Sequence, residues 1–267
     1  MLLNRARRAV RIPGFLSAAV FTGTEKVRCG YGNGDCVLVD PKDRLFGVAD
    51  ATERFPEASR RLLMNLVESV ESEETPDDET SWVETVNRAY RQQSYNMKTT
   101  ISCIALSGHY DSTSYVIQGG DSMVVVIDPE NGETMFKSSA DMNFAGRAPE
   151  LTSVHGLKLP DTPLVAVLAS DGFADLARQT GSGIEDFCLR LAREGPIEEA
   201  DRRVADIIRG LPEGAEYDDV AVLVMALPAP PPVNRKPVLI GGTGAASEKT
   251  FQRNLKEGKL ADKWLSD

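Results

Sequence analysis

Short apolar runs separated by turn-forming residues dominate the chain and limit the folds open to it. Seven of these runs are rich in Val, Ile, Tyr and Thr, residues that favour extended backbone, so each predicts a β-strand. The predicted strands are Cys36–Val39, Leu45–Ala49, Thr99–Leu106, Ser112–Gln118, Met123–Ile127, Leu164–Ala169 and Val220–Ala226. Tight turns at Tyr110-Asp111 and at Asp128–Gly132 would join neighbouring strands, which favours antiparallel pairing.

Amphipathic helices are predicted between groups of these strands. The expected helices are Glu57–Val70, Trp82–Tyr95, Ile184–Arg193 and Ile197–Arg209. Two lie between the early and the central strands, and two precede the last strand. This layout predicts an α+β fold, a four-layer α-β-β-α sandwich of two antiparallel sheets flanked by helices.

The chain divides into three zones by composition. Residues 1–227 carry the alternating strands and helices and are expected to form one domain. Residues 228–237 form a proline-rich linker. Residues 238–267 are polar and glycine-bearing, so we expect a flexible tail with one short helix near Phe251–Leu265. A docking segment for a partner is the alternative for this tail. No dimerisation motif is evident, and a monomer is expected.

Charge and cysteine usage exclude several classes of protein. Lys and Arg number 30 against 40 Asp and Glu, so the net charge is −10. Broad binding to nucleic acid or to an anionic membrane is therefore not expected. No apolar run is long enough for a membrane span. The four cysteines form no CxxC pair, which is typical of reduced thiols, and a cytoplasmic location is expected.

Aspartates recur at the ends of the apolar runs. The residues at these ends are Asp35, Asp50, Asp121, Asp171, Asp218 and Asp219. For any one of them the simple explanation is that Asp favours turns. If the strand ends converge, however, several carboxylates would share a small volume and repel one another. A divalent cation would relieve that repulsion, and oxygen ligands suit Mg²⁺ or Mn²⁺ rather than zinc.

The order of these motifs resembles the metal-dependent serine/threonine protein phosphatases of type 2C, the PPM family. The matching stretches, between about residues 20 and 226, are GNGD, LFGVAD, KTTISCIAL, IQGGDSMVVVI, LVAVLASDGFADL and EYDDVAVLVM. The resemblance implies hydrolysis of phosphoserine and phosphothreonine in proteins by a metal-activated water, without a covalent enzyme intermediate. It also implies two Mn²⁺ or Mg²⁺ ions as cofactors, a phosphoprotein as substrate and a role in signalling.

The resemblance also assigns roles to individual residues. The implied catalytic, metal-holding set is Asp35, Asp50, Asp171 and Asp218. Within it, Asp50 matches the aspartate that bridges two metals, and Asp35 matches an acidic ligand acting through water. The carbonyl of Ala51 is a further implied ligand. Asp121 and Asp175 match the positions that hold a third, weaker metal in many members.

Three features depart from the family pattern. The residues after Asp50, from Ala51 to Pro56, lack the usual glycines. Gly30 stands where the family has a phosphate-binding arginine, so Arg28 and Arg54 are the candidate replacements. The last motif is Asp218-Asp219 rather than Asp-Asn, which leaves open which of the two binds metal.

These departures keep alternative functions open. An active, metal-dependent protein phosphatase is the favoured reading because a scaffold has no reason to concentrate carboxylates. The alternative is a catalytically weak or inactive phosphatase-fold protein with a regulatory or binding role, a pseudophosphatase. A third hypothesis is a phosphatase that acts on small phosphate esters. Substrate choice depends on surface loops, so the sequence does not separate this activity from that of a protein phosphatase.

Overall fold

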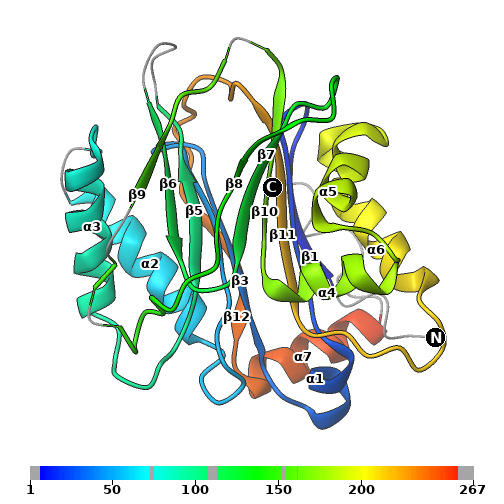
Figure 1. The fold of residues 1–267 in the computed structure, drawn as a ribbon. Helices are drawn as coiled ribbons and strands as arrows, with labels where there is room; N and C mark the ends of the chain where they lie inside the picture. Colours follow the sequence, from blue (N-terminus) through cyan, green and yellow to red (C-terminus); the bar gives the residue numbers. More distant parts are fainter. Residues whose placement is uncertain are drawn as a thin grey trace.

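Two six-stranded antiparallel sheets stack face to face, and helices cover their outer faces (Figure 1). The computed structural model describes residues 7–72, 75–107, 113–148, 150–151, 154–160 and 162–257. The predicted α+β fold with four layers is confirmed. Both sheets lie between the helices, so most strands are buried on both faces, which explains why they read as continuous apolar runs.

Each sheet combines strands from both halves of the chain. The first sheet has, in spatial order, β1 (Arg7–Ile12), β2 (Leu16–Phe21), β11 (Val220–Leu227), β10 (Leu164–Ala169), β7 (Met123–Ile127) and β8 (Thr134–Lys137). The second has β12 (Val238–Thr243), β3 (Asn33–Asp40), β4 (Leu45–Ala49), β5 (Ile101–Ala105), β6 (Ser114–Gly119) and β9 (Val154–Leu157). All neighbours pair antiparallel, as the tight turns predict.

The helices divide between the two outer faces. Helices α2 (Ala58–Glu71) and α3 (Glu79–Arg91) cover the second sheet. Helices α4 (Asp171–Gln179), α5 (Ile184–Arg193) and α6 (Ala200–Gly210) cover the first, with a short 3₁₀ turn at Ile197–Glu199 before α6. Two further helices, α1 (Thr24–Cys29) and α7 (Ala245–Lys256), lie at the lower end of the sandwich in Figure 1.

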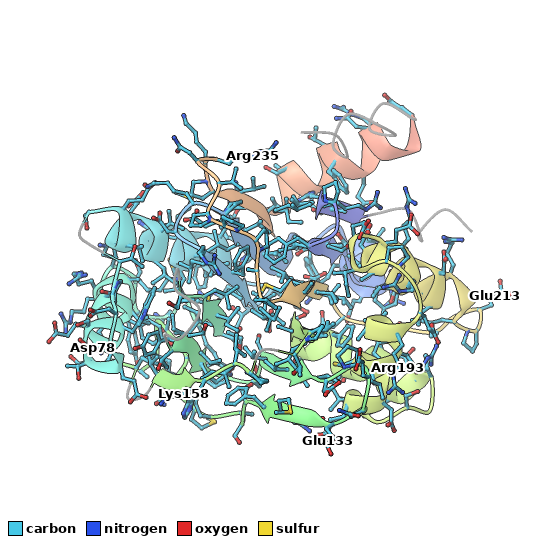
Figure 2. The ribbon with its side chains drawn as sticks, turned by 90° about the horizontal axis from the view of Figure 1, so that it is seen from above. Asp78, Glu133, Lys158, Arg193, Glu213 and Arg235 are labelled. Carbon is cyan, nitrogen blue, oxygen red and sulfur yellow. The ribbon has the colours of Figure 1, made fainter. Side chains whose placement is uncertain are left out.

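Strand β3 shows how the sequence builds the layers. Successive side chains point to opposite faces of a strand. Cys36 and Leu38 pack under the helices of the second sheet, whereas Val37 and Val39 enter the core between the sheets. The six charged side chains labelled in Figure 2 lie around the outside of the molecule.

The predicted elements are present, with additions. All seven predicted strands and all four predicted helices have counterparts in the structure. The turn at Asp128–Gly132 joins β7 to β8, whereas the Tyr110-Asp111 turn lies outside the described residues. Strands β1, β2, β8 and β9 and the helices α1 and α4 were not predicted.

The structure differs from the prediction of a flexible C-terminal tail. Val238–Thr243 forms strand β12, which pairs with β3 as an edge of the second sheet. A helix follows, but at Ala245–Lys256 rather than near Phe251–Leu265, and residues after 257 lie outside the described part of the chain. The segment Val-Leu-Ile that opens β12 has the composition of a strand, and its polar neighbours obscured it.

Membrane-spanning helices are not found. None of the helices in the described part of the chain combines the length and the apolar composition needed to cross a bilayer.

Candidate functional site

Three of the predicted aspartates converge at one edge of the sandwich. Asp50 follows β4, Asp121 precedes β7, and Asp171 follows β10 as the first residue of α4. Each contributes a carboxylate oxygen, and these oxygens all lie within 4.8 Å of one another. The three side chains line a cleft of about 460 Å³ that is open to solvent.

Close backbone contacts hold the aspartate-bearing loops together. A methyl group added to Gly172 would stand 2.0 Å from the carbonyl oxygen of Asp219, so glycine here lets the β10–α4 turn touch the start of β11. The amide of Asp50 donates to the Thr100 hydroxyl at 2.8 Å, and that hydroxyl pairs with the hydroxyl of Ser122 at 2.6 Å. These bonds join the end of β4 to the loops before β5 and β7.

Asp35 does not line the cleft and is almost fully buried, at 1% exposure. Its Oδ2 accepts a hydrogen bond from the Ser170 hydroxyl at 2.6 Å, and the Ser170 oxygen accepts from the Ala221 amide at 2.9 Å. Burial raises the pKa of Asp35 well above its usual range, and the neighbouring charge of Asp50 raises it further. Without a cation, the charged form of this carboxyl is therefore disfavoured.

Asp218 and Asp219 have different environments in the structure. Asp219 is buried, and its two carboxylate oxygens accept from the amides of Gly23 and Gly34 at 2.8 and 2.7 Å. Its carboxylate therefore holds backbone on both arms of the neighbouring loop, and Asp219 also lines the cleft. Asp218 has a half-exposed side chain that lines the cleft, and its Oδ1 accepts from the Asp219 amide at 2.7 Å.

Burial and mutual repulsion raise the pKa values of the cleft carboxyls. Burial raises the pKa of Asp171 to about 6, with added contributions from the charges of Asp121 and Asp218. The pKa of Asp50 lies well above its usual range, first because of burial and then because of Asp171. Burial also raises the pKa of Asp219 to about 7, although the two amides that it accepts from oppose this rise.

The donor set fits a divalent cation. Carboxylate oxygens on three separate loops converge on one point, and their charges destabilise one another. A hard cation such as Mn²⁺ or Mg²⁺ would replace that repulsion with attraction, and oxygen ligands match its preference. Asp50, Asp121 and Asp171 are therefore suited to hold a metal, with Asp218 on the wall of the same cleft.

Lys26 is a site residue that the sequence analysis missed. It belongs to the short helix α1, and only 8% of its side chain is exposed. Its ammonium group lies 2.6 Å from Glu53 Oε1 and 3.4 Å from Asp218 Oδ1. Burial alone would lower the pKa of Lys26, but the hydrogen bond to Glu53 and the charges of Asp218 and Asp219 give a net rise, which keeps it cationic. No motif marks a buried lysine, so only the fold reveals it.

The two predicted phosphate-binding arginines lie in different environments. The side chain of Arg28 is 64% exposed and pairs with Glu216 at 3.0 Å, and Arg28 does not line the cleft. Arg54 does line it, with its guanidinium group 5.4 Å from the ring centre of Phe55. Lys98 is a third cation of the cleft wall.

Of the two remaining predicted ligands, Ala51 lines the cleft and Asp175 does not. Ala51 lines the cleft and is nearly buried, with its amide donating to the Gly34 carbonyl at 3.1 Å. Asp175, one turn along α4 from Asp171, pairs with Arg178 and is not among the residues that line the cleft.

Comparison with solved structures identifies the fold. The chain aligns with the PPM Ser-Thr phosphatase MsPP from Mycobacterium smegmatis, solved with cacodylate, at a TM-score of 0.55 and 18% identity, over 73% of this chain and 94% of that one. It aligns with the photosystem II phosphatase PBCP at a TM-score of 0.61 and 18% identity, over 80% of this chain and 99% of that one. It also aligns with the catalytic domain of the serine/threonine phosphatase PstP, solved with two manganese ions. That alignment has a TM-score of 0.56 and 17% identity, over 79% of this chain and 97% of that one.

These likenesses show the fold and nothing finer. The resemblance to PPM phosphatases that the motifs indicate is thus confirmed as a structural resemblance. No protein-family model matches the sequence, and no curated protein matches it. Between a fifth and just over a quarter of this chain remains outside each of these alignments, although nearly all of each neighbour is covered.

Proposed function

We propose that the protein is a metal-dependent phosphatase that hydrolyses phosphoserine and phosphothreonine in proteins. The observation that carries the proposal is the convergence of Asp50, Asp121 and Asp171 in one cleft of a PPM-type fold. The neighbours named as serine/threonine phosphatases, including one solved with two manganese ions, support the substrate class and the metal. A cytoplasmic, monomeric protein is part of the same proposal.

The carboxylates would hold the metal, with the buried Asp35 acting from behind. Asp50, Asp121 and Asp171 provide converging oxygens, and Asp218 provides a further one at the wall. Bound Mn²⁺ or Mg²⁺ would supply Lewis-acid chemistry, stabilising negative charge and activating water at neutral pH. Asp35, held by Ser170, would accept a hydrogen bond or proton from the interior side of the site.

Cations around the cleft would bind the substrate phosphate. Lys26, Arg54 and Lys98 come from three separate segments and line the same cleft as the aspartates. Lys26 is the strongest candidate because its ammonium group is already held beside the carboxylates. A lysine binds phosphate as a point charge rather than through the two-pronged contact of arginine. Lys26→Met should therefore raise KM for p-nitrophenyl phosphate by about tenfold or more, with a smaller effect on Mn²⁺ affinity.

The first experiment measures hydrolysis of p-nitrophenyl phosphate and of a phosphothreonine peptide with Mn²⁺, and with EDTA as control. Asp171→Asn should abolish metal-dependent turnover. The matched control is Asp186→Asn, which makes the same change on the exposed face of α5 and should leave turnover intact. Equal turnover in the two variants would refute the proposed site. Preference for the peptide over small esters would support a protein substrate.

One observation favours the alternative of an inactive phosphatase-fold protein. Glu53, in the loop that lacks the family's glycines, pairs with Lys26, which also lies beside Asp218. Through these contacts Lys26, the candidate phosphate-binding cation, already pairs with carboxylates, and one of them is the candidate metal ligand Asp218. Mn²⁺ binding by calorimetry without turnover on either substrate would favour this second function, and Glu53→Gln would then show whether the pairing is the cause.

A further inference from the structure

Helix α7 buries a carboxylate against the segment that leads into the candidate site. Glu248, in the first turn of α7, is 2% exposed. Its Oε2 accepts from Arg8 at 2.7 Å and from the Thr243 hydroxyl at 3.0 Å. Its Oε1 accepts from the Thr22 hydroxyl at 2.9 Å and from the Gln252 amide at 2.8 Å.

A directed chain of hydrogen bonds runs from this carboxylate to Asp35. The hydroxyl of Thr22 donates to Glu248 and accepts from the Asn33 side-chain amide at 3.1 Å. The side-chain oxygen of Asn33 in turn accepts from the Asp35 backbone amide at 2.9 Å. Thr22 and Asn33 are both buried. Three hydrogen bonds therefore connect α7 to the backbone of a candidate site residue.

The chemistry of a carboxylate fixes the direction of every bond in this chain. A carboxylate only accepts, so Thr22 donates its single proton to Glu248. Its oxygen is then an acceptor toward Asn33, which must present its NH₂ group there. The Asn33 oxygen is consequently turned toward Asp35. A neutral group in place of Glu248 would no longer impose this order.

These hydrogen bonds close the base of the loop between Thr22 and Asn33. The Thr22–Asn33 bond joins the two arms of the loop, and one residue further along each arm Asp219 joins Gly23 to Gly34. The loop carries helix α1 and with it Lys26. Two buried carboxylates from different parts of the fold, Glu248 and Asp219, therefore hold the loop that carries Lys26 and the start of β3, where Asp35 lies.

We propose that Glu248 is a positioning residue for the candidate metal site, acting through Thr22 and Asn33 on the loop that carries Lys26 and on the start of β3, which carries Asp35. This inference rests on the proposed function, because it assigns the C-terminal segment β12–α7 a task in that site. Residues that orient a metal site from outside its ligands typically change metal affinity about 10–100-fold when they are altered.

The test compares two threonines that donate to the same carboxylate. Thr22→Val removes the hydroxyl that donates to Glu248 Oε1 and accepts from Asn33. Thr243→Val removes the hydroxyl that donates to Glu248 Oε2 and makes no hydrogen bond to Asn33. Thr22→Ser restores the hydroxyl and serves as the rescue. We expect Thr22→Val to weaken Mn²⁺ binding about tenfold or more in calorimetry, and Thr243→Val to stay within about twofold of wild type. Thr22→Ser should recover wild-type affinity.

Hydrogen exchange of the metal-free protein gives a readout that needs neither metal nor turnover. Peptides covering residues 23–36 should exchange faster in Thr22→Val than in Thr243→Val, with melting temperatures recorded for both. Equal Mn²⁺ affinity and equal exchange in the two valine variants would overturn the proposal. Wild-type protein that binds no Mn²⁺ would overturn the metal-site role together with the proposed function. The exchange data would then decide separately whether the Glu248 chain holds the loop.

Discussion

The contact between Gly172 and Asp219 leads to a prediction about both stability and the site. In Gly172→Ala the new methyl group would stand 2.0 Å from the Asp219 carbonyl oxygen, and ordinary contact begins at 3.4 Å. Both groups are fixed by backbone, so the β10–α4 turn and the start of β11 must separate by about 1.4 Å. The same movement displaces Asp171 from Asp218.

The expected magnitudes follow from that displacement. Overpacking of a well-filled interior costs about 1–3 kcal/mol. For a domain of this size, that lowers the melting temperature by roughly 2–12 °C. A misplacement of about 1 Å in a reacting group lowers turnover roughly 100-fold. We therefore expect a folded variant with a modest loss of stability and a much larger loss of Mn²⁺-dependent activity.

Gly210→Ala is the matched control. Gly210 ends α6, and a methyl group added there meets no atom within 4 Å. Its melting temperature should be unchanged or slightly raised, because alanine restricts the unfolded chain. Thermal unfolding, Mn²⁺ calorimetry and turnover of p-nitrophenyl phosphate are measured for both variants. If Gly172→Ala matches Gly210→Ala in all three, the close contact does not position Asp171 and the reasoning fails.

Three further predictions concern pH, thiols and a buried ion pair. Because burial raises the pKa values of Asp219 and Asp171 to about 7 and about 6, the folded metal-free protein keeps protons that the unfolded chain releases near pH 4. The free energy of unfolding should thus fall as the pH rises from about 4 to 7. Urea unfolding at pH 5.5 and 7.5 tests this, and a larger free energy of unfolding at pH 7.5 would contradict it. Only Cys29 of the four cysteines is exposed, so a thiol reagent should titrate one thiol in the folded protein and four after unfolding. Arg11→Leu should cost about 3–5 kcal/mol in urea unfolding because it removes the cation that pairs with the buried carboxylate of Asp201, while Mn²⁺ affinity stays at the wild-type value.

Local pattern was sufficient to predict most of the fold. The predicted strands are buried on both faces, so their apolar runs stand out from the turns between them. Strand β2, LSAAVF, is alanine-rich and follows a basic segment, which weakened its strand signal. Helix α4 is nine residues long and begins with the Asp-Gly of a motif that reads as a turn, so its helical character was missed.

The candidate site was only partly predictable because its key contacts join distant segments. The positions of Asp50 and Asp171 at the ends of predicted strands were enough to predict that they lie near each other, because such strand ends meet at one edge of a sandwich. The different environments of Asp218 and Asp219 depend on the amides of Gly23 and Gly34, which no local pattern specifies. Lys26 was overlooked because lysine is normally exposed, and its burial depends on the fold around α1.

The position of β12 beside β3 has a consequence for how the protein is made. The paired residues Val39 and Val238 are about 200 residues apart, and β2 likewise pairs with the late strand β11. At the usual pace of roughly 5–20 residues per second, the ribosome needs about 10–40 s to deliver the partner of an early strand. During that interval the nascent chain presents unsatisfied, apolar strand edges, which are prone to aggregation. Messenger RNAs truncated before β11 should therefore yield insoluble products, and synthesis of the full chain should depend on chaperones that shield the early strands.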